Sequence, residues 1–178
     1  MNPSKYNNIQ VALHWVVALL VLFMLVMGTF VLAQTPNSDP SKLTALRGHM
    51  VFGSVILLLT LLRLVWRRKS VQPDHAETGN ALLDKLGVAA HYGLNLLTLL
   101  AAASGIGLAL QAGLPRIVFG GQGILPSDFW AFTPRIAHGI LTKLLAALIA
   151  LHVVGALYHQ FIIKDRLFGR IWFGKRDM

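Results

Sequence analysis

Four stretches of roughly 20 mainly apolar residues occupy most of the chain, and they restrict its possible folds more than any other feature. They cover residues 11–33, 46–65, 86–110 and 136–163. As a helix, each is long enough to cross a hydrocarbon layer roughly 30 Å thick. With 55% apolar and only 13% charged residues, the 178-residue chain has the composition of a polytopic membrane protein. We predict an all-α membrane protein, a four transmembrane helix bundle formed by residues 1–178 as a single domain.

The boundaries of the helices are marked by polar residues, prolines and glycines. Ser4 is expected to cap the first helix, which would then begin near Lys5. The first apolar stretch is full length and has no small-residue cleavage site at a suitable distance, so we expect it to remain as a helix. Pro36 and Pro40 break the chain after it, and the glycine-rich segment 120–126 marks a longer loop before the last stretch.

The net charge of +9 reports the orientation of the chain in the membrane rather than a nucleic acid partner, which we do not expect. Most basic residues lie in the short flanks on one side of the bilayer, which the positive-inside rule makes cytoplasmic. An even number of spans then places both termini in the cytoplasm and loops 34–45 and 111–135 outside. These basic residues are Lys5, Arg63, Arg67, Arg68, Lys69, Lys85, Lys164, Arg166, Arg170, Lys175 and Arg176.

The candidate functional residues are histidines. The chain has no cysteine, which excludes iron–sulfur clusters held by thiolates and thioether-linked haem. Of its seven histidines, all except His75, in a cytoplasmic loop, fall within the apolar stretches. An imidazole in hydrocarbon is unfavourable unless it is paired, hydrogen-bonded or bound to a metal. One such histidine could simply bond to a neighbouring helix, but six indicate a common purpose.

The spacing of two histidines on the fourth helix predicts two cofactors stacked across the membrane. His138 and His152 are 14 residues apart. This spacing corresponds to a rise of about 21 Å and a rotation only about 40° short of whole turns. Both side chains therefore point to the same side of the helix, one near each surface of the bilayer. Each cofactor then requires a second ligand from another helix at the same depth.

Depth along the helices assigns these second ligands. His49 opens the second helix at the depth of His138, so these two form the outer pair. His14 lies toward the inner end of the first helix, and both His152 and His159 face it from the fourth. Using His159 would separate the two metal ions by about 31 Å, the whole slab, whereas His152 gives about 21 Å. Because the shorter separation favours electron tunnelling, we predict His14 with His152.

Several glycines in the spans support the same interpretation. They could make room for flat macrocycles, although small residues also serve ordinary helix packing in membranes. For any single glycine, packing is the default reading. The glycines are Gly28, Gly53, Gly93, Gly105, Gly107, Gly139 and Gly155.

Over nearly its whole length, the chain resembles the bacterial di-haem cytochrome b561 family. The resemblance rests on His14-Trp15, Gly48-His49, His91 and His138, and most specifically on Leu151-His152, the segment 156–159 and Lys164-Asp165. It differs from the family at Asn95, where tyrosine is common, and at Lys143 within the fourth helix.

This resemblance implies a bacterial inner (cell) membrane, multi-pass location and a set of cofactors. Two haem b groups would be held by His14 with His152 on the inner side and by His49 with His138 on the outer side. Closely similar members oxidise superoxide to oxygen at the outer, periplasmic haem and pass the electrons to ubiquinone. Related members instead carry electrons for a redox partner protein, a dehydrogenase or hydrogenase. The partners implied are therefore superoxide, ubiquinone and the lipid bilayer, with such an enzyme as the redox partner in the alternative case.

Basic residues on the external side suggest how a superoxide anion would be attracted. Arg47 and Arg135 lie just before the outer histidines, and Lys143 is expected to be buried beneath them. A positive funnel speeds the association of small anions, typically by about tenfold to a thousandfold. Alternatively, or in addition, Arg47 and Arg135 pair with haem propionates.

Candidates for a quinone site lie near the inner haem. His91, Tyr158 and His159 could bind quinone oxygens or relay the protons that quinol formation requires. His91 could equally tie helices together, and His159 could bond to a propionate. A different class of function also stays open, in which the histidines of a transporter or structural bundle handle protons or a transition metal.

Overall fold

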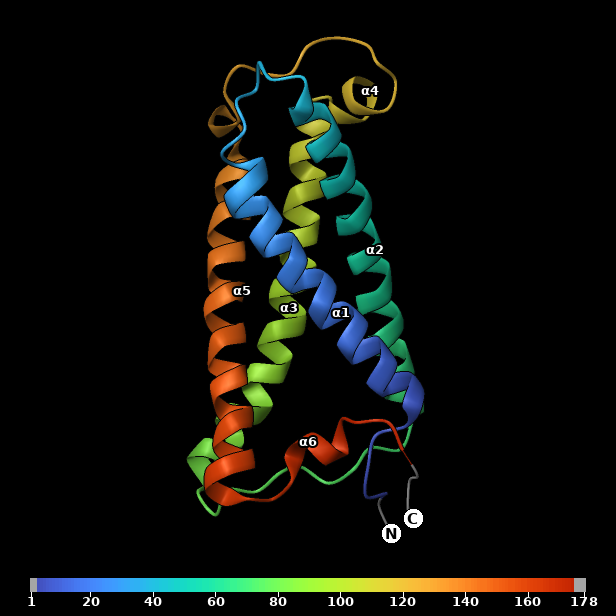
Figure 1. The fold of residues 1–178 in the computed structure, drawn as a ribbon, viewed down its shortest axis with the longest axis vertical. Coiled ribbons are helices and arrows are strands. Elements are labelled where there is room, and N and C mark those ends of the chain that lie inside the picture. The colour runs from blue at the N-terminus through green and yellow to red at the C-terminus, as the bar shows by residue number, and fades with distance from the viewer. Residues whose placement is uncertain (1–2, 175–178) are drawn as a thin grey trace.

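The computed structural model describes residues 3–174, which form helices and contain no strand (Figure 1). Four helical stretches are long and apolar enough to span a membrane: Asn8–Leu32, Ser41–Lys69, Ala81–Gln111 and Thr133–Ile163. The predicted four-span bundle is therefore confirmed. The elements are α1 (Asn8–Val26), the π-helical η1 (Met27–Leu32), α2 (Ser41–Lys69), α3 (Ala81–Gln111), α4 (Leu114–Val118), the 3-10 turn η2 (Phe129–Ala131), α5 (Thr133–Tyr158), the π-helical η3 (His159–Ile163) and α6 (Leu167–Arg170).

The first helix begins later than Ser4 predicted, and the cap residue explains why. Asn7 is the N-cap, and its side chain accepts a hydrogen bond from the Gln10 amide at 2.9 Å. The Gln10 side chain in turn accepts from the Asn7 amide, so the two residues form a capping box. Ser4 has no glutamate or glutamine three residues later, so it cannot form this reciprocal pair. The expectation that the helix begins near Lys5 is wrong by one turn.

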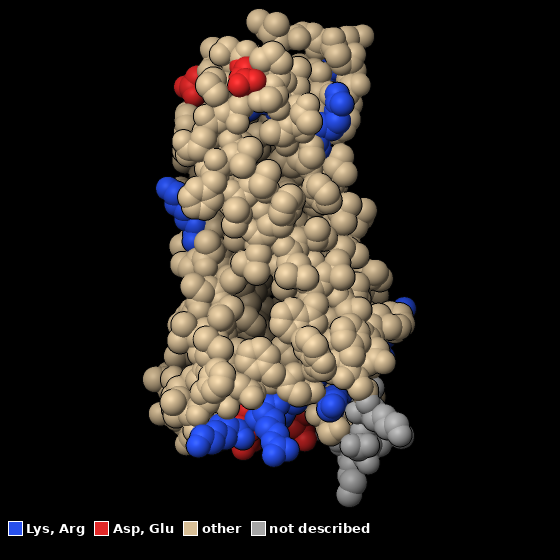
Figure 2. Space-filling model, viewed as in Figure 1, with Lys and Arg blue, Asp and Glu red and all other residues tan. Residues whose placement is uncertain are grey.

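The two ends of the bundle differ in structure and charge. We call the end that carries α4 the outer end, and the end where the described chain begins and finishes the inner end (Figure 1). At the inner end, the indole nitrogen of Trp15 donates to the Ile171 carbonyl at 2.9 Å, which ties the C-terminal segment to α1. Figure 2 shows basic side chains gathered at the inner end and a largely uncharged band above it. This distribution matches a protein that crosses a membrane.

Short helical turns cover the outer end. Leu114 and Val118 of α4 pack with Leu46 of α2 in a small buried cluster beneath the loops. Next to it, an oxygen of Asp39 accepts a hydrogen bond from the Ser41 amide at 2.8 Å. This bond lowers the pKa of the Asp39 carboxyl from its ordinary value and keeps a negative charge at this end.

The four spans do not pack equally on one another. α3 packs closely on α5, α1 packs on α2, and α2 packs on α3. Within the described residues, α5 makes little backbone contact with either α1 or α2. Figure 2 shows this face hollowed in its lower half, where Figure 1 places α1 and α5 apart. We call the space between α5 and the α1–α2 pair the slot; α3, which packs on both α2 and α5, closes it on one side.

Candidate cofactor sites

His49 on α2 and His138 on α5 lie opposite each other across the slot near the outer end. Their ring centroids are 6.1 Å apart, and their ring planes meet at 77°. An imidazole nitrogen binds a first-row metal ion at about 2 Å, so two imidazoles on opposite sides of one ion have centroids on the order of 6 Å apart. The structure thus brings the two outer histidines together at the spacing that one shared metal ion requires.

The tautomer of His138 is fixed by its neighbours on α3. Its Nδ1 lies 2.9 Å from the Ala101 carbonyl oxygen and 3.1 Å from the Ser104 hydroxyl. Because a carbonyl oxygen only accepts, Nδ1 must carry the proton and donate it. The lone pair is then on Nε2, the second ring nitrogen. A histidine that binds a metal is commonly oriented in this way, by donating its other nitrogen to a carbonyl group.

Each outer histidine ring rests against a glycine of a neighbouring helical segment. A Cβ added at Gly28 in η1 would meet Cε1 of His49 at 3.4 Å. A Cβ added at Gly105 in α3 would meet Cε1 of His138 at the same distance. The two glycines therefore leave room for the rings to take their positions. η1 is also π-helical, a local irregularity that is frequent at functional sites.

A cavity of about 80 Å³ lies next to the outer pair at the centre of the bundle. Residues of all four spans line it, and most of them are small or flexible apolar side chains that leave the two imidazoles as the main polar groups. The lining residues are Val21, Met24, Leu25, His49, Gly53, Ile56, Thr98, Ala101, Ala102, His138, Thr142 and Leu145.

A second cluster of histidines occupies the inner half of the bundle. The nearest ring to His152 is that of His91 on α3, with centroids 4.9 Å apart. His14 on α1 is linked to His91 through Arg63, which contacts Nδ1 of His14 and the side chain of Asn95, because Asn95 in turn bonds to the His91 carbonyl. Across residues 3–174, no three histidine or carboxylate side chains converge on one ion-sized point. A compact three-ligand metal centre, as catalytic zinc uses, is therefore not formed there.

The arrangement of the helices distinguishes His14 from His91 as a partner for His152. His49 and His138 belong to helices that do not pack directly, and so do His14 and His152. His91 and His152 belong to α3 and α5, which pack closely. A flat cofactor needs the wider gap, so the slot favours His14 with His152, while His91 lies beside them on α3.

Arg63 is the principal residue of the inner site that sequence reasoning placed elsewhere. It was expected at the cytoplasmic flank, but its guanidinium points into the bundle, 3.4 Å from Nδ1 of His14 and 3.3 Å from Oδ1 of Asn95. One turn further out on α2, the hydroxyl of Thr60 is fully buried and has no hydrogen-bond partner in the described chain. The signal available in the sequence was the 14-residue spacing from His49 to Arg63, the same as from His138 to His152.

His159 is held by Asp165, a residue that the sequence analysis quoted in the family motif without giving it a role. Its Nδ1 lies 2.6 Å from Oδ2 of Asp165, and Oδ1 of Asp165 accepts from the Leu167 amide at 3.0 Å. The residues on either side, Lys164 and Arg166, both have left-handed backbone conformations, with φ of 62° and 56°. Such conformations are uncommon for non-glycine residues and indicate a turn held by its surroundings. The turn fixes the His159 ring at the inner end of the bundle.

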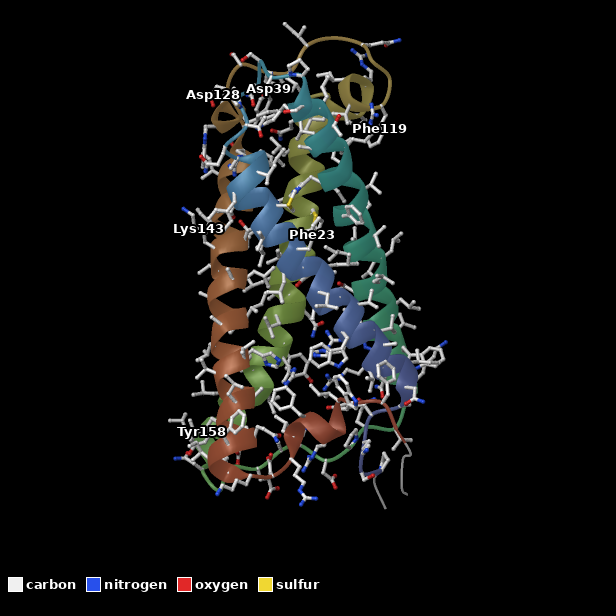
Figure 3. All side chains as sticks on the ribbon, in the orientation of Figure 1. Phe23, Asp39, Phe119, Asp128, Lys143 and Tyr158 are labelled. Carbon is white, nitrogen blue, oxygen red and sulfur yellow. The ribbon has the colours of Figure 1, made fainter. Side chains whose placement is uncertain are left out.

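The three quinone candidates lie in different surroundings. His91 is next to His152, and His159 is paired at the inner end. Tyr158 is exposed, and its ring centroid is 6.4 Å from that of His159 (Figure 3). Tyr158 and His159 are thus neighbours at the inner surface, while His91 lies deeper.

The three steering candidates also differ. Arg47 donates two hydrogen bonds to the Val118 carbonyl, at 2.7 and 3.2 Å, and Arg135 lies 4.3 Å from the ring centroid of Trp130. The expectation that Lys143 is buried beneath them is wrong, because its side chain is exposed and points away from the bundle (Figure 3). The position lies on the lipid-facing side of α5, where a long lysine chain can extend toward the headgroups.

A membrane bundle that gathers imidazoles at two depths along a slot defines a class, the membrane proteins that hold metal cofactors between helices, among them the b-type cytochromes. The family model described as prokaryotic cytochrome b561 matches residues 5–174, so the chain belongs to that family. As a prokaryotic cytochrome b561 it is a multi-pass protein of the bacterial inner membrane.

Three relatives illustrate the range of the family. A cytochrome b562 of Cereibacter sphaeroides is 32% identical, over 93% of this chain and 94% of its own length. A probable superoxide oxidase, CybB, of Yersinia pestis is 26% identical over 97% of this chain and 98% of its own. A protein named cytochrome b561 homolog 2, of Escherichia coli, is 26% identical over 92% of this chain and 88% of its own.

Membership of this family implies that the chain binds haem b, and the structure fits that cofactor in three respects. The donor set is imidazole, which is an axial ligand of haem iron. The glycines leave the space beside the outer rings that a side chain would fill. At the inner site, the buried Thr60 hydroxyl and the Arg63 guanidinium are hydrogen-bond donors, and no carboxylate of the described residues accepts from them. Such donors suit the carboxylate of a haem propionate.

Proposed function

We propose that the protein is a superoxide:ubiquinone oxidoreductase with two haem b sites, the outer held by His49 and His138 and the inner by His14 and His152. Bound haem b would supply one-electron transfer between the two sides of the membrane. Two superoxide anions are oxidised to two molecules of oxygen, and ubiquinone takes up the two electrons with two protons to form ubiquinol. The observation that carries the proposal is the gathering of imidazoles at two depths of the bundle: His49 faces His138 near the outer end, and a cluster that contains His152, His91 and His14 lies near the inner end.

The charge distribution supports the direction of this reaction. Arg47 and Arg135 lie at the outer end of the bundle, where their charges would favour the approach of an anion. The basic inner end would face the cytoplasm by the positive-inside rule, with both termini there. The name of the Yersinia pestis relative agrees with superoxide as the donor.

Protons for ubiquinol are available at the inner end. Asp165 accepts from Nδ1 of His159, which leaves Nε2 of the ring to accept or donate a proton at the surface. Tyr158 next to it offers a hydroxyl to a quinone oxygen. These two residues and His91 are the proposed quinone contacts.

The second candidate function is a non-catalytic electron carrier for a partner dehydrogenase or hydrogenase. It is favoured by the most similar of the three relatives reported above, which bears the name of a cytochrome alone. The two functions differ in whether this chain reacts with superoxide without a partner.

The experiment that separates them follows purified protein in lipid vesicles with a short-chain ubiquinone and a steady source of superoxide. The proposal expects one ubiquinol for every two superoxide anions consumed, and no ubiquinol when superoxide dismutase is added. The His138→Ala variant, prepared in parallel, should form none. Haem reduction by a partner protein, with no ubiquinol from superoxide, would instead establish the electron carrier.

A further inference from the structure

Arg63 takes, on α2, the place that His152 takes on α5. Both helices run from the outer to the inner end, and each carries an outer histidine 14 residues before the residue in question. The shared spacing means a rise of about 21 Å and nearly the same face of the helix. The guanidinium contacts His14 of α1 and Asn95 of α3, which confirms that it points into the bundle. Arg63 therefore belongs to the inner site.

No carboxylate of the described residues neutralises the charge of Arg63. Both groups it contacts are uncharged partners, an imidazole nitrogen at 3.4 Å and an amide oxygen at 3.3 Å. Among residues 3–174, no carboxylate lies within 4.0 Å of it, since the single ion pair there joins His159 and Asp165. An arginine keeps its proton in proteins. A fixed positive charge with no carboxylate partner among the described residues is therefore present at the inner site.

Asn95 holds this charge in place. Its side-chain nitrogen donates to the His91 carbonyl at 2.7 Å, which orients the amide so that Oδ1 accepts from Arg63. The amide is thus a bridge between the backbone of α3 and the guanidinium of α2. Because both bonds use one short side chain, the guanidinium has little freedom to leave the slot.

The outer site differs from the inner one in the group that its imidazole contacts. The Nδ1 of His138 faces the negative end of the Ala101 carbonyl dipole. The guanidinium of Arg135 lies over the Trp130 ring near the N-terminal end of α5, where water screens charge more strongly than in the middle of the bundle. Arg47 is engaged by the Val118 carbonyl. His138 of the outer site therefore donates to a carbonyl oxygen, which increases the electron density on the imidazole, whereas His14 of the inner site contacts a cation.

We infer that Arg63, positioned by Asn95, raises the reduction potential of the inner site above that of the outer site and so makes the inner end the electron sink. This inference rests on the two-haem arrangement proposed above. Taking up one electron adds one negative charge to a site, and a fixed cation nearby stabilises that reduced state. The electron given up by the donor at the outer end then moves inward downhill. Arg63 is a positioning and tuning residue, since it does not touch the reacting donor.

The test is an anaerobic potentiometric titration of the purified haem-loaded protein in nanodiscs, followed by the absorbance of reduced haem. The wild type should show two one-electron components. Arg63→Gln removes the charge. The midpoint potential of the higher component should then fall by about 59 mV, which makes its reduced-to-oxidised ratio at a fixed potential about tenfold lower. Arg63→Lys keeps the charge and should retain most of that potential. Arg47→Gln, the matched loss of charge at the outer end, should leave the higher component in place.

His138→Ala assigns the components to sites. This variant lacks an outer ligand, and its remaining haem should show the higher potential and respond to Arg63→Gln as before. A remaining haem at the lower potential would overturn the inference, as would an Arg63→Gln protein in which neither component moves. A wild type that holds a single haem would instead disprove the two-site arrangement itself.

If the Arg63→Gln protein does not assemble, Asn95→Leu tests the same inference. It removes the acceptor of the guanidinium and leaves the charge in the chain. The higher component should then fall by a smaller amount than a complete loss of charge causes. An unmoved higher component in this variant would contradict the role assigned to Asn95 and Arg63.

Discussion

At the scale of single residues, the outer site depends on which nitrogen of His138 is committed to the protein. His138 donates its Nδ1 proton to the Ala101 carbonyl, so only Nε2 can serve as a ligand. His49 and His152 make ring contacts but no hydrogen bond within residues 3–174. Several half-buried imidazoles in a membrane interior are unfavourable unless something binds them. Haem b supplies that binding in the proposed arrangement.

Substitution of one outer ligand should remove one haem. His138→Ala should lower the haem content per chain by half and leave a low-spin spectrum from the inner site. The measurement is the ratio of extracted haem to protein after purification. His75→Ala, in the polar inner loop, is the control and should keep the full content. An unchanged ratio in His138→Ala would show that His138 is not a ligand.

Two substitutions test whether His14 or His91 is the second ligand opposite His152 at the inner site. His91 is nearest to His152 in the structure, yet α3 and α5 pack too closely for a flat cofactor. His14→Ala should therefore lose the inner haem, whereas His91→Ala should retain it and change only the quinone reaction. Haem content and the low-spin signal in paramagnetic resonance spectra distinguish the two. The reverse result would assign the ligand to α3.

At the scale of elements, glycines fix how closely the helices approach the histidine rings. Gly105→Val would put a Cβ 3.4 Å from the His138 ring and add two further methyl groups in the same space. Overpacking of this kind costs about 1–3 kcal/mol, and here the ring must move to relieve it. We expect a lower midpoint of thermal unfolding and incomplete haem loading at the outer site.

Gly87→Val is the matched control for this prediction. It makes the same change on the same helix, at a position where an added Cβ has no neighbour within 4 Å. Haem loading in this control should equal that of the wild type. Equal loading in both variants would mean that the ring of His138 does not depend on Gly105.

The number and position of the spans could be predicted because hydrophobic length alone decides them. The ends could not be predicted as well, because polar residues extend each helix beyond its apolar part. α3 begins at Ala81, five residues before the apolar stretch, since Asn80 caps it by accepting from the Leu82 amide. The π-helical segments η1 and η3 and the short α4 left no periodic signal in the sequence.

The site was predictable to the extent that helix geometry determines it. Depth along the helices predicted that His49 lies opposite His138, and the structure sets the two rings 6.1 Å apart. The interhelical bonds of Arg63 with His14 and Asn95 depend on how the helices are rotated about their axes, which counting along one helix does not give. The pairing of His159 with Asp165 depends on residues with left-handed backbone conformations in a turn, which no pattern in the sequence predicts.

At the scale of the whole molecule, the distribution of charge connects the bundle to its substrate. Arg47→Gln and Arg135→Gln together should slow the reduction of the protein by superoxide by up to about tenfold and weaken its dependence on salt. Stopped-flow absorbance at the haem band measures both quantities. Lys85→Gln changes the charge at the inner end and serves as the control, with no expected effect on this step. Rates that fall equally in the control would argue against steering at the outer end.

The measurement that tests the central claim most directly is the haem content of the purified wild-type protein, taken together with its absorption spectrum in both redox states. The account predicts two haem b groups per chain, both low-spin, as two pairs of imidazole ligands require. A preparation with a single haem, with a high-spin spectrum, or with no haem at all would contradict it.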